Sequence, residues 1–350
     1  MSENSESIRD ESDDEPCESD CECCDYPFPF LNLPREIQLK VVREVPDYWT
    51  YISLQQTSSE INELCLVDKK IVLANLRKGL VAPFYDYYDF HASLHLPEGA
   101  VKQPPPTGWP EITLKSFRSF GKSDLAIEVL RHLPYIENLE YHDNINNIDY
   151  KCNVIDYSAW KLGDEYPGKS MEDYFGYEEP VSKHKIAIAY GYESGGVTFM
   201  LDTLTGSVYE EIIRCTSGVE DEPVEDYFES KKEEFRSFKL MFIPGFDPPE
   251  NFTDEKYPYD AEKMEKQREP RSPDKWIMDT DEDGLWIRHL YRKFGWPSPA
   301  WKKDEGIQAI KDFVARRDQE HDQYQQDLGM QMRLFDAQRQ RNEQHHAAGQ

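Results

Sequence analysis

The chain has few basic residues for its length and no long apolar run. Its 350 residues include 40 Lys and Arg against 68 Asp and Glu, which gives a formal net charge of −28. This charge repels phosphate groups, so we expect no nucleic-acid partner and no docking on anionic membranes. No stretch of 18 apolar residues occurs, and the acidic N-terminus lacks the apolar core of a secretory signal. We therefore expect no membrane span, and a cytoplasmic and/or nuclear location.

The motifs of common catalytic and cofactor sites are also missing. The glycines between Gly191 and Gly196 do not have the spacing of a phosphate-binding loop, and no serine lies in a G-x-S-x-G elbow. His91 and His95 would share a helix face but lack the Glu of the zinc-protease motif, so we interpret them as an incidental pair. We expect no catalytic residue, cofactor or metal, and predict that the protein is not an enzyme.

Residues 1–25 contain eleven acids, one base and four of the seven cysteines. So polar a segment cannot bury enough surface to offset its ordering entropy, and we expect a disordered acidic tail. Clustered thiolates can bind zinc or copper(I), but the neighbouring acids oppose thiolate formation, and we favour reduced thiols without metal. Ser12 precedes three acids and suits an acid-directed kinase, although an unmodified tail is an equal alternative. The cysteines of this segment are Cys17, Cys21, Cys23 and Cys24.

Residues 26–80 have the apolar period of short helices. The segment Pro34 to Val45 places Ile37, Val41 and Val45 on one side, which predicts an amphipathic helix of about three turns. The stretch 57–60 has the spacing of a capping box, and the helix that it opens should end at Gly79. Together with a short apolar turn at 51–54, this predicts a module of three helices.

The run FLNLPREI from Phe30 to Ile37, with the apolar positions after it, resembles an F-box of the fungal type over residues 27–76. F-box domains are three-helix modules that dock on a Skp-type adaptor and so join a cullin–RING ubiquitin ligase. The alternative is that Ile37 and Val41 simply pack on the C-terminal half of the chain. The resemblance implies that the following residues contact the adaptor or shape the docking helix: Leu33, Pro34, Ile37, Val41, Val45, Leu54 and Ile61.

The sequence after residue 80 predicts a proline-rich connector at 81–122, followed by an α+β domain over residues 123–318. Alternating apolar residues over 184–213 predict an antiparallel meander with one buried face, turning at Gly195-Gly196 and Thr205-Gly206. A helix should begin after Pro223, with a buried phenylalanine stripe that reaches Phe242. We expect a polar loop over 245–283 and a Gln-rich polar tail or solvated helix over 319–350.

A second resemblance covers residues 186–242. Leu201-Asp202, the run from Gly206 to Tyr209, and Tyr227-Phe228 with Phe235 look like the Smi/Knr-like (SUKH) fold, an α+β protein-binding scaffold. The aromatic stripe from Trp286 to Phe294 is interpreted as a closing helix of this domain or, alternatively, as a patch that captures a substrate.

These patterns predict an α+β protein in which an F-box-like helical module precedes an antiparallel sheet packed with helices. The function that we predict is that of a substrate-recognition subunit of a cullin–RING ubiquitin ligase, which binds a Skp-type adaptor and an unidentified target protein. The alternative is a Smi/Knr-like scaffold or regulatory protein without a role in the ligase.

Overall fold

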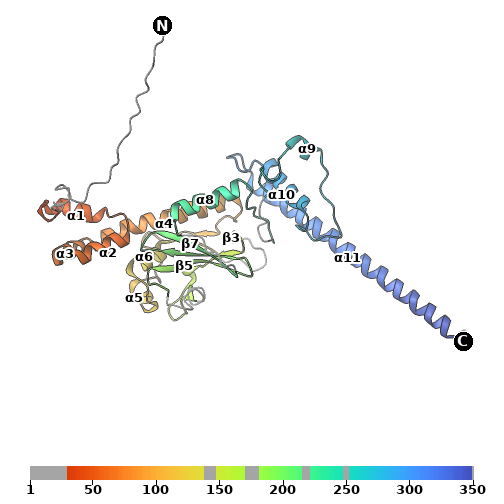
Figure 1. Cartoon of the computed structure of the whole chain (residues 1–350), viewed down its shortest axis with the longest axis horizontal. Coiled ribbons are helices and arrows are strands. Elements are labelled where there is room, and N and C mark those ends of the chain that lie inside the picture. The colour runs from red at the N-terminus through yellow and green to blue at the C-terminus, as the bar shows by residue number, and fades with distance from the viewer. Residues whose placement is uncertain (1–29, 138–146, 170–180, 215–220, 247–251, 349–350) are drawn as a thin grey trace, which may run out of the picture.

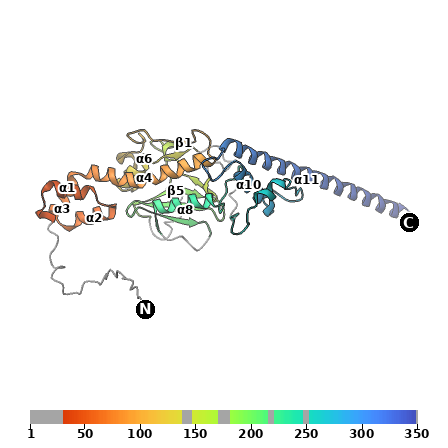
Figure 2. The same ribbon diagram turned by 90° about the horizontal axis from the view of Figure 1, so that it is seen from above.

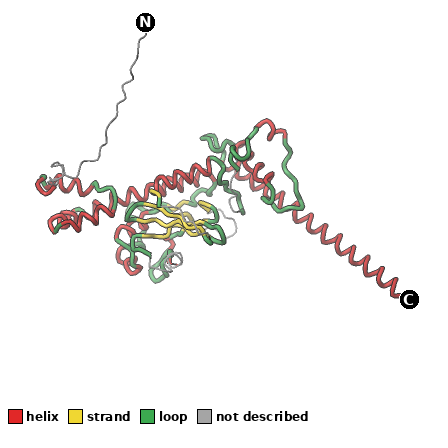
Figure 3. Tube along the Cα trace, viewed as in Figure 1, coloured by secondary structure: helices red, strands yellow, loops and turns green. Residues whose placement is uncertain are grey.

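The computed structural model describes residues 30–137, 147–169, 181–214, 221–246 and 252–348, and the side chains of the last helix as far as residue 340. The acidic segment 1–25, with its cysteines and Ser12, lies outside the described residues. Helices and an antiparallel sheet occur together, so the fold is α+β as expected (Figure 3).

The N-terminal module consists of a short 3-10 helix and three α-helices that lead into a fourth. Asp47 caps α2 by accepting from the backbone N of Thr50, and Ser58 caps α3 by accepting from that of Ile61. The capping box predicted over Thr57 to Glu60 is therefore misplaced by one residue, because Thr57 ends α2 and Ser58 is the N-cap. The short apolar turn at 51–54, which supplied the second of the three predicted helices, lies within α2, and that helix is longer than expected. The elements are η1 (Phe30–Asn32), α1 (Arg35–Arg43), α2 (Tyr48–Thr57), α3 (Ser59–Val67) and α4 (Lys69–Leu94).

Helix α4 runs through Gly79 and Pro83, so the helix end predicted at Gly79 is wrong. Pro83 lacks the N–H that would bond to the carbonyl of Gly79, which normally interrupts a helix. A continuous buried stripe, which includes Leu76, Leu80 and Phe84, offsets this loss by packing under the sheet and its neighbouring helices. The expected connector at 81–122 therefore contains the second half of α4, followed by shorter elements.

The central sheet has six antiparallel strands that pair in chain order from β3 to β8. The predicted meander is confirmed in β5, β6 and β7, with the expected turns between them. The expectation of one buried face is wrong for β6, because every residue of this strand is buried. The strands are β3 (Asn147–Asp149), β4 (Cys152–Val154), β5 (Lys185–Gly191), β6 (Val197–Asp202), β7 (Ser207–Ile212) and β8 (Glu222–Pro223), and a separate pair is β1 (Val101–Lys102) with β2 (Tyr135–Ile136).

Helix α4 contacts α6 (Asp124–His132) on one flank and α8 (Val224–Arg236) on the other (Figure 2). The predicted stripe is only partly helical, because α8 ends at Arg236 and Phe238 has a positive φ of 63°. Phe238 and Phe242 nevertheless remain buried in the second core. Shorter elements of the middle region are α5 (Leu114–Phe117), η2 (Arg118–Phe120) and η3 (Tyr157–Ala159).

The C-terminal region has a hydrophobic core of its own, formed by α10 (Asp281–Lys293), the first half of α11 (Lys303–Ala348) and the segment after α8. The predicted polar loop at 245–283 contains a short helix, α9 (Ala261–Lys266). Trp286 and Phe294 are half-buried and pack against this core, which agrees with the closing-helix interpretation of their stripe. The chain beyond Asp318 is helical, as one of the two alternatives predicted.

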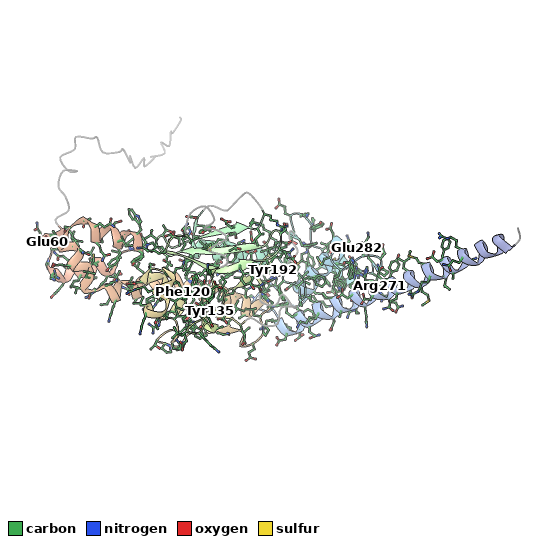
Figure 4. The ribbon with its side chains drawn as sticks, turned by 90° about the horizontal axis from the view of Figure 1, so that it is seen from below. Glu60, Phe120, Tyr135, Tyr192, Arg271 and Glu282 are labelled. Carbon is green, nitrogen blue, oxygen red and sulfur yellow. The ribbon has the colours of Figure 1, made fainter. Side chains whose placement is uncertain are left out.

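The three regions follow one another along the long axis of the molecule. The N-terminal helices occupy one end, the sheet lies in the middle, and α11 projects from the other end (Figure 1). Glu60 lies on the N-terminal helices at one end of the molecule, and Arg271 lies beside α11 towards the opposite end (Figure 4).

Candidate functional site

Exposed apolar side chains gather at the two ends of the described chain. Fifteen large apolar residues are exposed in the described part of the chain, and thirteen of them lie at its ends: seven between residues 31 and 71, and six in α11 beyond His321. Patches of this kind on a folded protein mark interaction surfaces more often than single scattered residues do. The seven in the N-terminal module, which we call the N-terminal apolar face, are Leu31, Ile37, Val41, Trp49, Leu66, Val67 and Ile71.

The start of this face is held by polar contacts. Pro34 precedes the first helical residue and fixes the turn into α1, because its ring allows only a narrow range of φ. Gln38 is buried and donates from its Nε2 to the carbonyl oxygens of Phe30 (3.1 Å) and Leu31 (2.9 Å). These bonds tie η1 to α1, so that Leu31 and Ile37 are presented from one rigid unit.

Further cross-links hold the helices of the module together. Arg43 forms an ion pair with Asp68 (2.7 Å) at the junction of α3 and α4, and Asn75 donates to the carbonyl of Arg43 (3.1 Å). The buried hydroxyl of Tyr51 donates to the carbonyl of Cys65 (2.9 Å), and burial raises the pKa of this phenol. The apolar face is therefore carried by a preformed scaffold.

The predicted adaptor residues fall into two groups. Ile37 (45% exposed) and Val41 (46%) lie open on α1, Pro34 is exposed and Leu33 is half-buried. Val45 is only 9% exposed and belongs to the core, whereas Leu54 and Ile61 are half-buried and pack against that core. A partner could therefore contact the first group directly, while the second group supports it from within.

Sequence reasoning missed the exposed residues of α3 and of the start of α4. Leu64, Cys65, Leu66 and Val67 are four consecutive apolar residues in a short helix. Successive helical residues point about 100° apart, so one buried side cannot cover all four. The structure buries Leu64 and Cys65 and leaves the other two exposed. This run was the available signal for a second apolar surface.

The module attaches to the sheet through α2 and not through α1. The backbone N of Trp49 donates to the carbonyl of Leu204 (3.1 Å), and Tyr48 packs edge-on against His184 at 5.6 Å between ring centroids. The alternative in which Ile37 and Val41 pack on the C-terminal half therefore does not apply, because both remain open to solvent.

The histidine pair is a direct contact within α4. His91 and His95 are buried, and the Nδ1 of His91 lies 3.0 Å from the Nε2 of His95. Burial lowers the pKa of both, that of His91 to about 3. The interpretation as an incidental pair is thus corrected to a neutral, hydrogen-bonded core pair. No group of three potential metal ligands occurs among the residues that the structure describes.

A second buried polar cluster lies between the sheet and α8. Lys231 contacts Asp149 (2.9 Å) and Glu210 (2.6 Å), and the hydroxyl of Tyr227 donates to Glu210 (2.5 Å). Burial alone would lower the pKa of Lys231, but the two carboxylates raise it above its usual value. Because these charges satisfy one another inside the core, we interpret the cluster as structural.

Comparison with known proteins adds no relative: no family model, curated protein or solved structure matches the chain. Within the described residues, none of the helices combines the length and the apolar character needed to cross a bilayer. The candidate site therefore depends on the geometry of the N-terminal apolar face.

Proposed function

We propose that the chain is a substrate-recognition subunit of a cullin–RING ubiquitin ligase, and that it binds a Skp-type adaptor through its N-terminal apolar face. The observation that carries the proposal is the exposure of Ile37 and Val41 on a helix whose other side is firmly packed. An F-box needs such a face, because its adaptor covers apolar side chains that the isolated module leaves in water.

Three features support this role. The exposed residues lie on short helices whose ends are capped or cross-linked, so little conformational entropy is lost when a partner binds. Ile37 and Val41 lie one turn apart on α1, so a single partner surface can cover both. The face also lies at the far end of the molecule from α11, so an adaptor there would leave the other regions accessible (Figure 1).

In this proposal the chain itself performs no catalysis. Ubiquitin transfer belongs to the partners, and the sheet region and C-terminal region present the surface that binds the target protein. The site of action is the cytoplasm, the nucleus or both, where the adaptor and the cullin are found.

The test is a binding assay between the purified full-length chain and a purified Skp-type adaptor. We expect Ile37→Glu with Val41→Glu to weaken binding at least tenfold, because two charges would be buried against an apolar partner. Leu162→Glu is the matched control, since Leu162 is 80% exposed and lies far along the sequence from this face. Both variants should keep the melting temperature of the wild type.

Two results would contradict the proposal: no binding to any Skp-type adaptor, or binding that Ile37→Glu with Val41→Glu leaves unchanged. In either case the Smi/Knr-like scaffold becomes the better hypothesis, because β5 to β7 and α8 form the segment that carries that resemblance. The double variant is preferred to changes at Leu33 and Pro34, since Pro34 also positions the start of α1.

A further inference from the structure

The second half of α11 is a helix without tertiary support. Its buried stripe begins on the C-terminal core with Ile310, Val314, Arg317 and His321, at alternating spacings of four, three and four residues. The ring of His321 packs against Trp276 at 3.9 Å between ring centroids. His321 is the last buried residue of α11 among those described. Beyond it α11 leaves the body of the protein (Figure 1).

The apolar stripe continues past the point at which its cover ends. The same alternation of three and four residues continues with Tyr324, Leu328, Gln331 and Phe335, which are exposed. Met332 and Leu334 lie on the two flanks of this stripe and are also exposed. A repeat of seven residues with apolar side chains at the first and fourth positions is the pattern by which helices pair in coiled coils.

Charge on α11 is divided between two segments. Residues 318–327 contain four acids and no Lys or Arg, whereas residues 328–340 contain Arg333 and Arg339 against one acid, Asp336. Partial burial and the nearby charge of Asp322 raise the pKa of Asp318, which shows how crowded the acidic segment is. A parallel pair of α11 helices would set the acidic segments against each other, and an antiparallel pair sets each against a basic segment.

We propose that the second half of α11 pairs with the same segment of a second copy of this chain, as an antiparallel two-helix coiled coil centred between Gly329 and Met330. The stripe is self-complementary in this register: Tyr324 lies opposite Phe335 of the second copy, and Leu328 lies opposite Gln331. Because the dimer has twofold symmetry, each of these contacts occurs twice.

The flanking positions fit the same register. One flank of the stripe carries Asp318, Gln325, Met332 and Arg339, each seven residues from the next. In an antiparallel pair this flank of one helix lies against the same flank of the second helix, whose residues run in the opposite direction. Gln325 then lies beside Met332 of the second copy, in the part of α11 that has left the body of the protein.

The body of the protein leaves room for the approaching helix. Where α11 leaves the C-terminal core, a shallow groove of about 720 Å³ lies against it, lined by residues that include Arg271, Glu320, Tyr324 and Asp327. The second helix would run towards this groove.

The dimer does not depend on the proposed adaptor binding, and it would place the two N-terminal apolar faces at opposite ends of an elongated particle.

The test is sedimentation equilibrium of the purified full-length chain over a range of about 1 to 100 µM. We expect a monomer–dimer equilibrium, and Phe335→Glu should raise the dissociation constant at least tenfold by burying a charge in the stripe. Met330→Glu is the matched control: Met330 is exposed on the same helix, but it lies outside the stripe and its flanks, so the dissociation constant should change less than threefold. Thermal melting checks that both variants remain folded.

The antiparallel register has its own test. Tyr324→Glu and Phe335→Arg should each weaken the dimer at least tenfold, and the double variant should recover most of the lost affinity, because the two charges lie opposite each other only in the antiparallel arrangement. A chain that is monomeric throughout the range, or a dimer indifferent to Phe335→Glu, overturns the proposal. If the double variant fails to restore the dimer, the antiparallel arrangement is overturned. If the chain is monomeric and its stripe binds a different protein, the choice of a second copy is overturned.

Discussion

The N-terminal apolar face and the second half of α11 both expose large apolar side chains, but only the first has a packed core behind it. Val42, Leu64, Cys65 and Val72 are buried core residues of the same helices that carry the N-terminal apolar face. In α11 no described side chain after His321 is buried. The difference indicates two kinds of interface: a preformed surface that a folded partner can cover, and a single helix that needs a second helix to bury its stripe.

One buried ion pair anchors α11 one turn before its last buried residue, His321. Arg317 donates from Nε to Oδ1 of Asp283 (2.9 Å) and from Nη2 to Oδ2 (3.2 Å), and both side chains are 1% exposed. Arg317 also donates to the carbonyl of Ser272 (3.1 Å). These contacts tie α11 to α10 and to the loop before it, one turn before the helix emerges.

The largest effect is expected from Arg317→Ala. Removing one member of a buried pair leaves the other charge without compensation, so the free energy of unfolding should fall by about 3–5 kcal/mol. Arg316→Ala is the control, because Arg316 pairs with Glu269 at the surface, where an ion pair contributes about 0–1 kcal/mol. Urea denaturation measures both. Equal effects of the two variants would show that α11 is not anchored where the structure indicates.

A smaller loss of stability is expected when the pH is lowered, because a buried histidine pair lies where α4 meets α11. Lys303 of α11 donates to the carbonyls of Ala92 and Leu96 (3.0 Å each), beside the buried pair His91 and His95. Burial lowers the pKa of His91 to about 3, below the value of about 6.5 in an unfolded chain. The stability due to the neutral imidazole is therefore complete above pH 6.5 and is lost as the pH falls towards the folded pKa.

From pH 7 to pH 5 this histidine alone should lower the free energy of unfolding by about 2 kcal/mol. Four other histidines have lowered pKa values and add to the decline of the wild type: His95, His132, His184 and His289. The informative measurement is thus the difference between the wild type and His91→Leu, whose loss of stability over the same range should be smaller by that amount. Identical pH dependence of the two chains would contradict the assignment.

The smallest effect is expected from shortening α11. A chain that ends at Leu328 should unfold within about 0.5 kcal/mol of the full chain when both are measured at high dilution, because none of the removed side chains that the structure describes is buried. At high concentration the full chain should gain stability that the short chain lacks, since dimer formation favours the folded state by mass action. A large loss at high dilution would mean that the stripe folds back on its own chain.

Local patterns in the sequence were sufficient for several elements of the fold. The period of Ile37 and Val41 and the alternation around Ile186 to Leu201 predicted a helix and strands that the structure contains. These features depend on residues a few positions apart, whose backbone geometry decides which side chains share a face. The exposed run at Leu66 and Val67 was readable for the same reason but was overlooked.

The sequence by itself determined the acidic charge, the α+β class and the amphipathic character of the N-terminal helices. Only the tertiary structure decided that α4 continues through Gly79 and Pro83, that β6 is buried on both faces, and that Val45 is core while Val41 is exposed. Local propensity cannot settle these points, because each depends on which distant segment covers a given side chain. Burial is a property of the packed chain, and contacts with remote segments outweigh the preferences of neighbouring residues.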